Sequence, residues 1–216
     1  MKFFFDLDGT LTNPRLGITR CFQYAMEGMN HKAWPTSALE QFIGPPLQDS
    51  FRRVLNTTHQ PLINEAIRLY RDRYSHQGLF ENELYPGIPD NLRLLRDSGH
   101  DLLVVTSKPT VYAERIIRHF ELDLLFPKTY GSELSGEHAD KRALIAHVLD
   151  QEGILPEQAI MVGDRAYDIL GAKMNRVRSA GVLWGFGSEV ELLQAGADII
   201  VSSVATLAHR LLEGPP

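Results

Sequence analysis

The strongest constraint on the fold is an alternation of short apolar runs with amphipathic segments, which begins near Leu84 and continues almost to the end of the chain. The apolar runs are rich in Val, Ile and Leu and lack the polar alternation of a half-exposed strand. They are therefore predicted to be strands buried on both faces. The predicted strands are residues 102–105, 159–162, 181–184 and 198–201, with residues 3–5 as a further strand.

The segments between these strands have helical periodicity, because Leu, Ile and Val recur three and four residues apart. Repeated strand–helix units are typical of a parallel sheet covered by helices on both faces. The predicted fold class is α/β, with a Rossmann-like parallel sheet as its core. The predicted helices are residues 111–120, 139–151, 168–175 and 189–195.

Residues 16–82 interrupt the alternation, since they contain helical periodicity and no convincing strand. Turn-forming residues at 13–14 and 85–87 bound this region and suit a pair of hinges. We therefore predict an all-helical domain inserted into the sheet domain. The predicted helices are residues 18–29, 38–42, 47–55 and 62–76, and the predicted domains are 1–13 with 84–216 for the core and 14–83 for the insert.

The charge balance argues against a polyanionic partner. The 216 residues include 22 Lys and Arg against 27 Asp and Glu, a net charge of −5, so neither nucleic acid nor an anionic membrane surface is expected as a partner. The apolar runs fall far short of the roughly 20 residues that a membrane helix requires. The single cysteine, Cys21, excludes an intramolecular disulfide and is usual for a reducing compartment. We expect a cytoplasmic protein, and none of these features predicts its oligomeric state.

Two acids follow the first predicted strand. Ligands of open parallel sheets bind beyond the carboxyl ends of the strands, and alternate side chains of an extended chain share a face. Asp6 and Asp8 would thus present two carboxylates to one point, which suits a hard cation; capping of the strand end is the alternative. A calcium loop does not fit, because Gly9 is at the fourth position instead of the sixth and Gly17 occupies the twelfth, where a glutamate is needed.

Two further segments carry hydroxyl groups and cations. Thr106, Ser107 and Lys108 directly follow a buried strand, where residues of a ligand site are expected. Capping of the next helix by Thr106 or Ser107 is the alternative. Lys141 lies at the start of the predicted helix 139–151. A basic group at the positive end of a helix dipole suits a nearby anion, and taken alone Lys141 fits a solvated surface lysine better.

In the last segment, Asp164 lies at a strand end and Asp168 follows four residues later. Taken alone, this segment fits an N-cap acid followed by an acid on a helix face. All four segments follow predicted strands or begin predicted helices. Because the carboxyl ends of parallel strands lie at one edge, a single shared site accounts for them better than independent caps do.

In this order and spacing the four segments resemble the haloacid dehalogenase superfamily of magnesium-dependent phosphatases, over nearly the whole chain. The helical insert is similar to the small cap of the phosphoglycolate-phosphatase-like branch. The resemblance implies that Asp6 is the nucleophile and Asp8 the general acid/base. It also implies phosphate binding by Thr106, Ser107 and Lys141, and Mg²⁺ binding by Asp6, the backbone of Asp8 and Asp164, with Asp168 in support.

Two positions depart from the family pattern. The family lysine in this branch is often followed by proline, whereas Arg142 follows Lys141, which leaves Lys108 as a competitor for the phosphate-pairing role. The pair after the first segment is often Asp-Ser and here is Asn13-Pro14, which affects the hinge more than the chemistry.

The resemblance implies magnesium-dependent hydrolysis of a small phosphate monoester through a phospho-aspartyl intermediate. Phosphoglycolate is the first expected substrate, followed by pyrophosphate (pyrophosphatase activity) and nucleoside monophosphates (5'-nucleotidase activity). A sugar phosphomutase would share the catalytic residues, whereas dehalogenation has no need of Asp8. A catalytically silent binding protein would be expected to lack an acid, and all four acids are present. Candidates for substrate selection are Arg52, Arg53 and the loop at residues 44–46.

Overall fold

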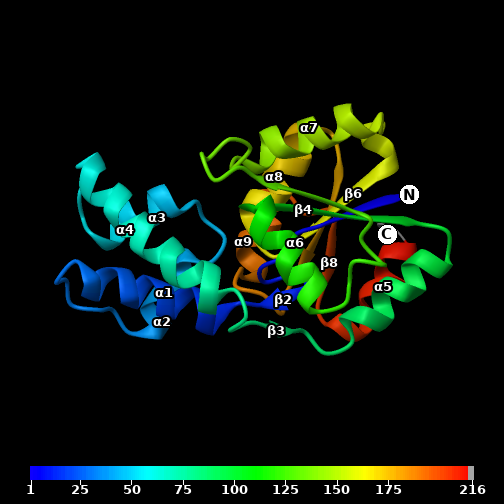
Figure 1. Ribbon diagram of the computed structural model, residues 1–216. Helices are drawn as coiled ribbons and strands as arrows, with labels where there is room; N and C mark the ends of the chain where they lie inside the picture. Colours follow the sequence, from blue (N-terminus) through cyan, green and yellow to red (C-terminus); the bar gives the residue numbers. More distant parts are fainter. Residues whose placement is uncertain (214–216) are drawn as a thin grey trace. The chain divides into compact units, whose positions relative to one another are not determined.

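The computed structural model describes residues 1–213, within which the chain forms two compact units (Figure 1). The first unit combines Met1–Asn13 with the chain from Leu84 onward, and the second is Pro14–Glu83. The last three residues of the predicted core, 214–216, lie outside the described residues.

The first unit is built on a six-stranded sheet in the order β5-β4-β1-β6-β7-β8. All its neighbouring strands are parallel, and the central strand β1 places Phe3 opposite Leu102 of β4 and Ile160 of β6. The carboxyl ends of the strands therefore meet at one edge, and the α/β prediction is confirmed. The strands are β1 (Lys2–Phe5), β4 (Asp101–Pro109), β5 (Lys128–Ser132), β6 (Ala159–Gly163), β7 (Arg178–Val182) and β8 (Ile199–Val201).

Helices cover both faces of this sheet (Figure 1). Phe4, Leu103 and Met161 point from three adjacent strands into a core that Leu144 of α7 and Ala172 of α8 complete. On the opposite face α5 packs against β4 and α10. The helices are α5 (Ile88–Asp97), α6 (Thr110–His119), α7 (Lys141–Glu152), α8 (Ala166–Met174), α9 (Glu189–Ala195) and α10 (Leu207–Glu213), with 3₁₀ turns at Pro156–Gln158 and Val204–Thr206.

Three of these elements were not predicted, namely β5, α5 and α10. Strand β5 lies at the edge of the sheet and is only partly buried, so it lacks the apolar run on which strand prediction relied. Helix α5 begins immediately after a Pro-Gly turn and carries Pro89 in its first turn, a position that tolerates proline. Strand β7 also begins and ends earlier than the predicted 181–184, which leaves Trp184 beyond the strand.

A separate two-stranded sheet lies where the chain passes between the units. It pairs β2 (Thr12–Asn13) with β3 (Glu83–Leu84). The hinge role of residues 13–14 and 85–87 stays a prediction.

The second unit is helical apart from the end that enters β3, in agreement with the predicted helical insert. Its core is aromatic, because the ring of Phe22 lies 4.8 Å from that of Phe51 and 5.1 Å from that of Tyr70. Helix α1 also approaches the backbone of the π-helix so closely that a Cβ on Gly17 would lie 1.9 Å from the carbonyl oxygen of Gly78. The helices are α1 (Arg15–Gly28), α2 (Thr36–Leu39), a 3₁₀ turn (Glu40–Phe42), α3 (Leu47–Val54), α4 (Gln60–Arg73) and a π-helix (Tyr74–Gly78). Among the described residues, no helix combines the length and apolar character needed to cross a bilayer.

Candidate active site

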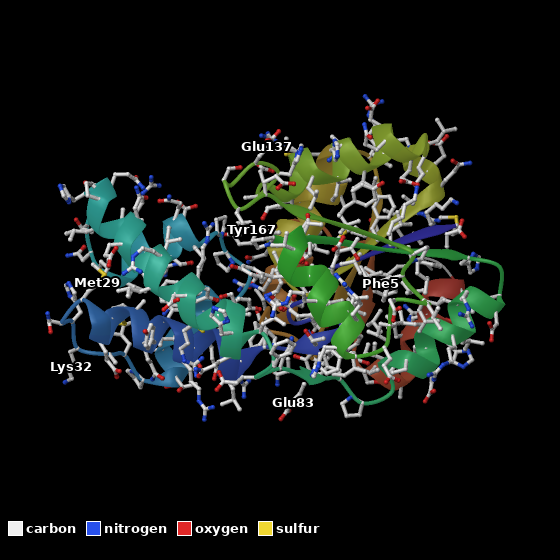
Figure 2. The ribbon with its side chains drawn as sticks, viewed as in Figure 1. Phe5, Met29, Lys32, Glu83, Glu137 and Tyr167 are labelled. Carbon is white, nitrogen blue, oxygen red and sulfur yellow. The ribbon has the colours of Figure 1, made fainter. Side chains whose placement is uncertain are left out.

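Asp6 is the first residue beyond the central strand β1, directly after the fully buried Phe5 labelled in Figure 2. Its N–H donates to the carbonyl of Val162 in β6 at 2.9 Å, which extends the ladder by one residue. The chain then turns sharply at Gly9, whose φ of +87° disfavours residues with a Cβ. A Cβ there would also lie 2.2 Å from a carboxylate oxygen of Asp164, so Gly9 permits both the turn and the close approach of the Asp164 carboxylate to the backbone.

Lys141 is the first residue of α7, whose N-cap Asp140 accepts hydrogen bonds from backbone N–H groups of the first turn. Its buried ammonium donates to Asp6 Oδ1 at 2.9 Å and to the carbonyl of Val105 at 3.0 Å. It also lies 2.8 Å from Asp168 Oδ1. Burial lowers the pKa of this lysine, but the charges of Asp168 and Asp6 outweigh burial and raise the pKa above its ordinary value. Lys141 is therefore held as a cation against Asp6.

The two acids that contact Lys141 belong to a cluster of three buried carboxylates. Asp6, Asp164 and Asp168 each offer an oxygen that lies within 4.8 Å of the others. Burial, followed by repulsion from Asp168 and Asp6, raises the pKa of Asp164 well above its usual range. Burial raises the pKa of Asp168 to about 6, although Lys141 opposes this shift. Burial and mutual repulsion thus make it unfavourable for all of these carboxyl groups to be ionised at once. A hard divalent cation bound between them would compensate their negative charge.

Asp164 is held by Thr10, which follows β1, and by the segment between β7 and α9. The N–H of Phe186 donates to Asp164 Oδ2 at 2.8 Å, and the hydroxyl of Thr10 reaches Oδ1 at 3.4 Å. A Cβ on Gly187 would lie 1.9 Å from the Asp164 carbonyl oxygen, so position 187 leaves no room for a side chain. The indole of Trp184 donates to the carbonyl of Thr10 at 3.0 Å. None of these supports was predicted, although glycines flanking an aromatic residue directly after a buried strand are a usable signal.

Asp168 is held at the start of α8. The N–H of Arg165 donates to Asp168 Oδ2 at 3.1 Å. Glu191 of α9 accepts from Arg165 Nε at 2.9 Å and from the N–H of Ala166 at 2.8 Å. Glu191 thus ties the loop between Asp164 and Asp168 to a neighbouring helix, a role that its helical position alone does not indicate.

Asp8 has different surroundings from Asp6. Its Oδ2 lies 2.5 Å from the ammonium of Lys108, and only 11% and 6% of the two side chains are exposed. Its Oδ1 is buried and has no hydrogen-bond partner among the described residues. Burial raises the pKa of Asp8 more than Lys108 lowers it, which favours a carboxyl group that can carry a proton. The Asp8 side chain does not join the acidic cluster, and metal contact through its backbone carbonyl stays a prediction.

The predicted phosphate-binding hydroxyls lie at the end of β4, the strand beside β1. Thr106 is buried, and its hydroxyl oxygen accepts from the N–H of Lys108 at 3.3 Å. Ser107 is partly exposed, and its carbonyl accepts from the hydroxyl of Ser132. The two candidate lysines are thus divided between the two acids, with Lys141 on Asp6 and Lys108 on Asp8.

The chain is similar to several known proteins. A 5'-nucleotidase of Pseudomonas aeruginosa is 47% identical over 188 residues, which cover 87% of this chain and 85% of that protein. The tyrosine-protein kinase PtkA of Mycobacterium tuberculosis is 34% identical over 204 residues, 94% of this chain and 68% of the kinase. A crystal structure described as a predicted phosphatase from Clostridium acetobutylicum has a TM-score of 0.94 and 42% identity, and the match covers 98% of both chains.

The sequence profile of the haloacid dehalogenase-like hydrolases matches residues 3–182, which include all four motif segments. The resemblance found in the sequence is confirmed, and the chain belongs to the haloacid dehalogenase-like hydrolase family.

Proposed function

We propose that the protein hydrolyses small phosphate monoesters, with Asp6 as the nucleophile and Asp8 as the general acid/base. The observation that carries this proposal is the division of two neighbouring carboxylates between two environments. Asp6 is held against Lys141 inside an acidic cluster, whereas Asp8 lies beside Lys108 with one buried oxygen unpartnered. Carboxylates with such different surroundings are suited to different roles in one reaction.

In the first step a carboxylate oxygen of Asp6 attacks phosphorus, and the bond from phosphorus to the ester oxygen breaks. Asp8 gives its proton to the departing oxygen, which leaves as an alcohol. In the second step Asp8 takes a proton from water as the water oxygen attacks the phosphorus of phospho-Asp6. Inorganic phosphate is released, and Asp6 returns as a free carboxylate.

Attack of a carboxylate on a phosphate dianion brings like charges together, at about 4 kcal/mol per charge pair at 4 Å and an effective dielectric constant near 20. Lys141 offsets part of this repulsion, since its ammonium contacts Asp6. Thr106 and Ser107 are proposed to bind the phosphoryl oxygens. Their strand ends beside β1, at the edge of the sheet where Asp6 lies.

We infer that Mg²⁺ is held by Asp6 and Asp164 together with the backbone carbonyl of Asp8. Asp168 is paired with Lys141 and is proposed to support this ligand set. When bound, the ion would neutralise charge on the nucleophile and the phosphoryl group.

The proposed substrate is a small phosphorylated metabolite. The 47% identity to a protein named 5'-nucleotidase favours nucleoside 5'-monophosphates as the first to be tested, ahead of phosphoglycolate and pyrophosphate. A sugar phosphomutase would use the same acids but return the phosphoryl group to the sugar, so it would release no stoichiometric phosphate.

The test is a phosphate-release screen of these substrates with Mg²⁺ present, applied to the wild type and to Asp→Asn variants. Asp6→Asn should form no covalent intermediate and should fall to background. Asp8→Asn should lose about 10²- to 10⁴-fold in turnover, the usual contribution of a general acid/base. With an activated aryl phosphate it should accumulate a phosphoryl mass on Asp6, because the leaving group needs no proton and the base is gone.

The matched control is Asp90→Asn, since this acid of α5 is 84% exposed and pairs with Arg93 at 2.8 Å across one helical turn. It should match the wild type. Wild-type turnover by Asp8→Asn, or a phosphoryl label on any residue other than Asp6, would overturn the assignment.

A further inference from the structure

The segment that carries Thr106 and Ser107 is an irregularity in the sheet. Strand β4 pairs with β5 up to Val105 opposite Tyr130, and pairs again at Pro109 opposite Ser132, with a register shift between. From Val105 to Pro109 the chain advances four residues, whereas from Tyr130 to Ser132 it advances two. The extra length places residues 106–108 in a bulge at the carboxyl edge, where bulges commonly redirect side chains beside active sites.

Strand β5 holds this bulge from one side. The hydroxyl of Ser132, itself buried, donates to the carbonyl of Ser107 at 2.9 Å. The hydroxyl of Thr110 donates back to the carbonyl of Ser132 at 3.3 Å. The neighbouring Gly131 is in tight contact, because a Cβ there would lie 2.4 Å from the carbonyl oxygen of Lys108. The segment is therefore fixed by one side-chain hydroxyl and by one position that admits no side chain.

The constraint extends along the peptide. Because a trans peptide is planar, fixing the carbonyl of Ser107 also fixes the direction of the N–H of Lys108. That N–H is the group that donates to the hydroxyl oxygen of Thr106 at 3.3 Å. On the other side of the bulge, Lys141 holds the carbonyl of Val105 at 3.0 Å. Both ends of the three-residue segment are therefore held by buried polar side chains.

We propose that Ser132 is a positioning residue for phosphate binding, which acts through the Ser107 peptide on the hydroxyl of Thr106. This inference rests on the proposed function, in which Thr106 and Ser107 bind the phosphoryl group. Ser132 itself touches no reacting atom, so removal of its hydroxyl should weaken phosphate binding without removing any ligand of the phosphate.

The experiment measures the affinity for inorganic phosphate by calorimetry in the presence of Mg²⁺, together with kcat, KM and the melting temperature. Ser132→Ala should lose about three- to tenfold in phosphate affinity, as expected for one hydrogen bond. KM for the best substrate should rise by a similar factor. Gly131→Ala leaves the Ser132 hydroxyl intact but displaces Lys108, so it should weaken phosphate binding at least as much.

The matched control is Ser179→Ala. Ser179 is a buried serine of β7 whose hydroxyl donates to Asp198 at 3.0 Å, and its strand carries none of the phosphate-binding residues. It should lower the melting temperature and leave phosphate affinity unchanged. If Ser132→Ala behaves like Ser179→Ala, Ser132 is only structural and the inference is wrong. If the wild type neither binds phosphate nor releases it from any ester, the proposed function fails first and the inference fails with it.

Discussion

Replacement of Lys141 by methionine tests the electrostatics of the site most directly. Methionine keeps an unbranched apolar chain but removes the ammonium that contacts Asp6, Asp168 and the Val105 carbonyl within 3.0 Å. The lysine side chain is only 4% exposed, so water does not replace the lost cation. Lys141→Met therefore leaves buried carboxylates without their shared partner.

Two magnitudes follow from this geometry. Removal of one partner from a buried ion pair costs about 3–5 kcal/mol of stability, because the remaining charge stays buried. For a chain of this size the melting temperature should fall by roughly 6–20 °C, at about 2–4 °C per kcal/mol. In catalysis, a positive charge contributes about 4 kcal/mol to each opposite charge at a separation of 4 Å and an effective dielectric constant near 20. Loss of one such contribution corresponds to about a 10³-fold loss in kcat/KM.

The assay combines thermal unfolding in excess chelator with phosphate release in Mg²⁺. The control is Lys128→Met, which removes a lysine that is 55% exposed and pairs with Glu152 at 2.7 Å. A surface pair of this kind contributes at most about 1 kcal/mol, so the control should stay near the wild type in both measurements. If Lys141→Met were as stable as Lys128→Met, or kept kcat/KM within tenfold of the wild type, the reasoning would be refuted.

Three further predictions concern the metal, the insert and its stability. Excess chelator should abolish phosphate release, and Mg²⁺ but not Ca²⁺ should restore it, because Ca²⁺ prefers a larger and looser shell; turnover in chelator would contradict the site. Replacement of the loop at residues 44–46 should lower kcat/KM for the preferred substrate far more than for a small aryl phosphate, whereas equal losses would mean that the loop only supports the insert. Hydrogen bonding from Arg73 lowers the pKa of Glu81 below its ordinary 4.5. The stabilisation from Glu81 is therefore present above that value and lost as the pH falls through the lowered pKa. In urea unfolding, Glu81→Gln should be less stable than the wild type at pH 7, and a difference that did not shrink toward pH 3 would disprove this.

The sheet was predictable where its strands are buried on both faces. β1, β4 and β6 lie at or beside its centre. Their short apolar runs favour a buried strand over a helix or a loop. Once these strands were predicted to be parallel, the polar residues that follow them were expected at one edge of the sheet. The structure brings Asp6, Lys141 and Asp168 into direct contact from distant parts of the sequence.

The supports of the site were not predictable in the same way. Phe186 acts through its backbone N–H, a group that every residue except proline possesses. Glu191 looks like any other acid of an amphipathic helix until its contacts with the loop before α8 are known. Strand β5 is a polar edge strand, so the apolar pattern did not reveal the element that carries Ser132.

The positions of the two lysines show how local backbone features determine which cation contacts which acid. The sequence left Lys108 and Lys141 as competitors because Arg142 follows Lys141, where the family lysine is often followed by proline. The bulge in β4 turns Lys108 toward Asp8. Lys141 reaches Asp6 from the start of α7, where a Cβ on Gly171 would lie only 3.0 Å from the lysine Cγ, so the absence of a side chain there makes room for the lysine stem. The bulge in β4 and the glycine at position 171 thus help to give each acid its own cation.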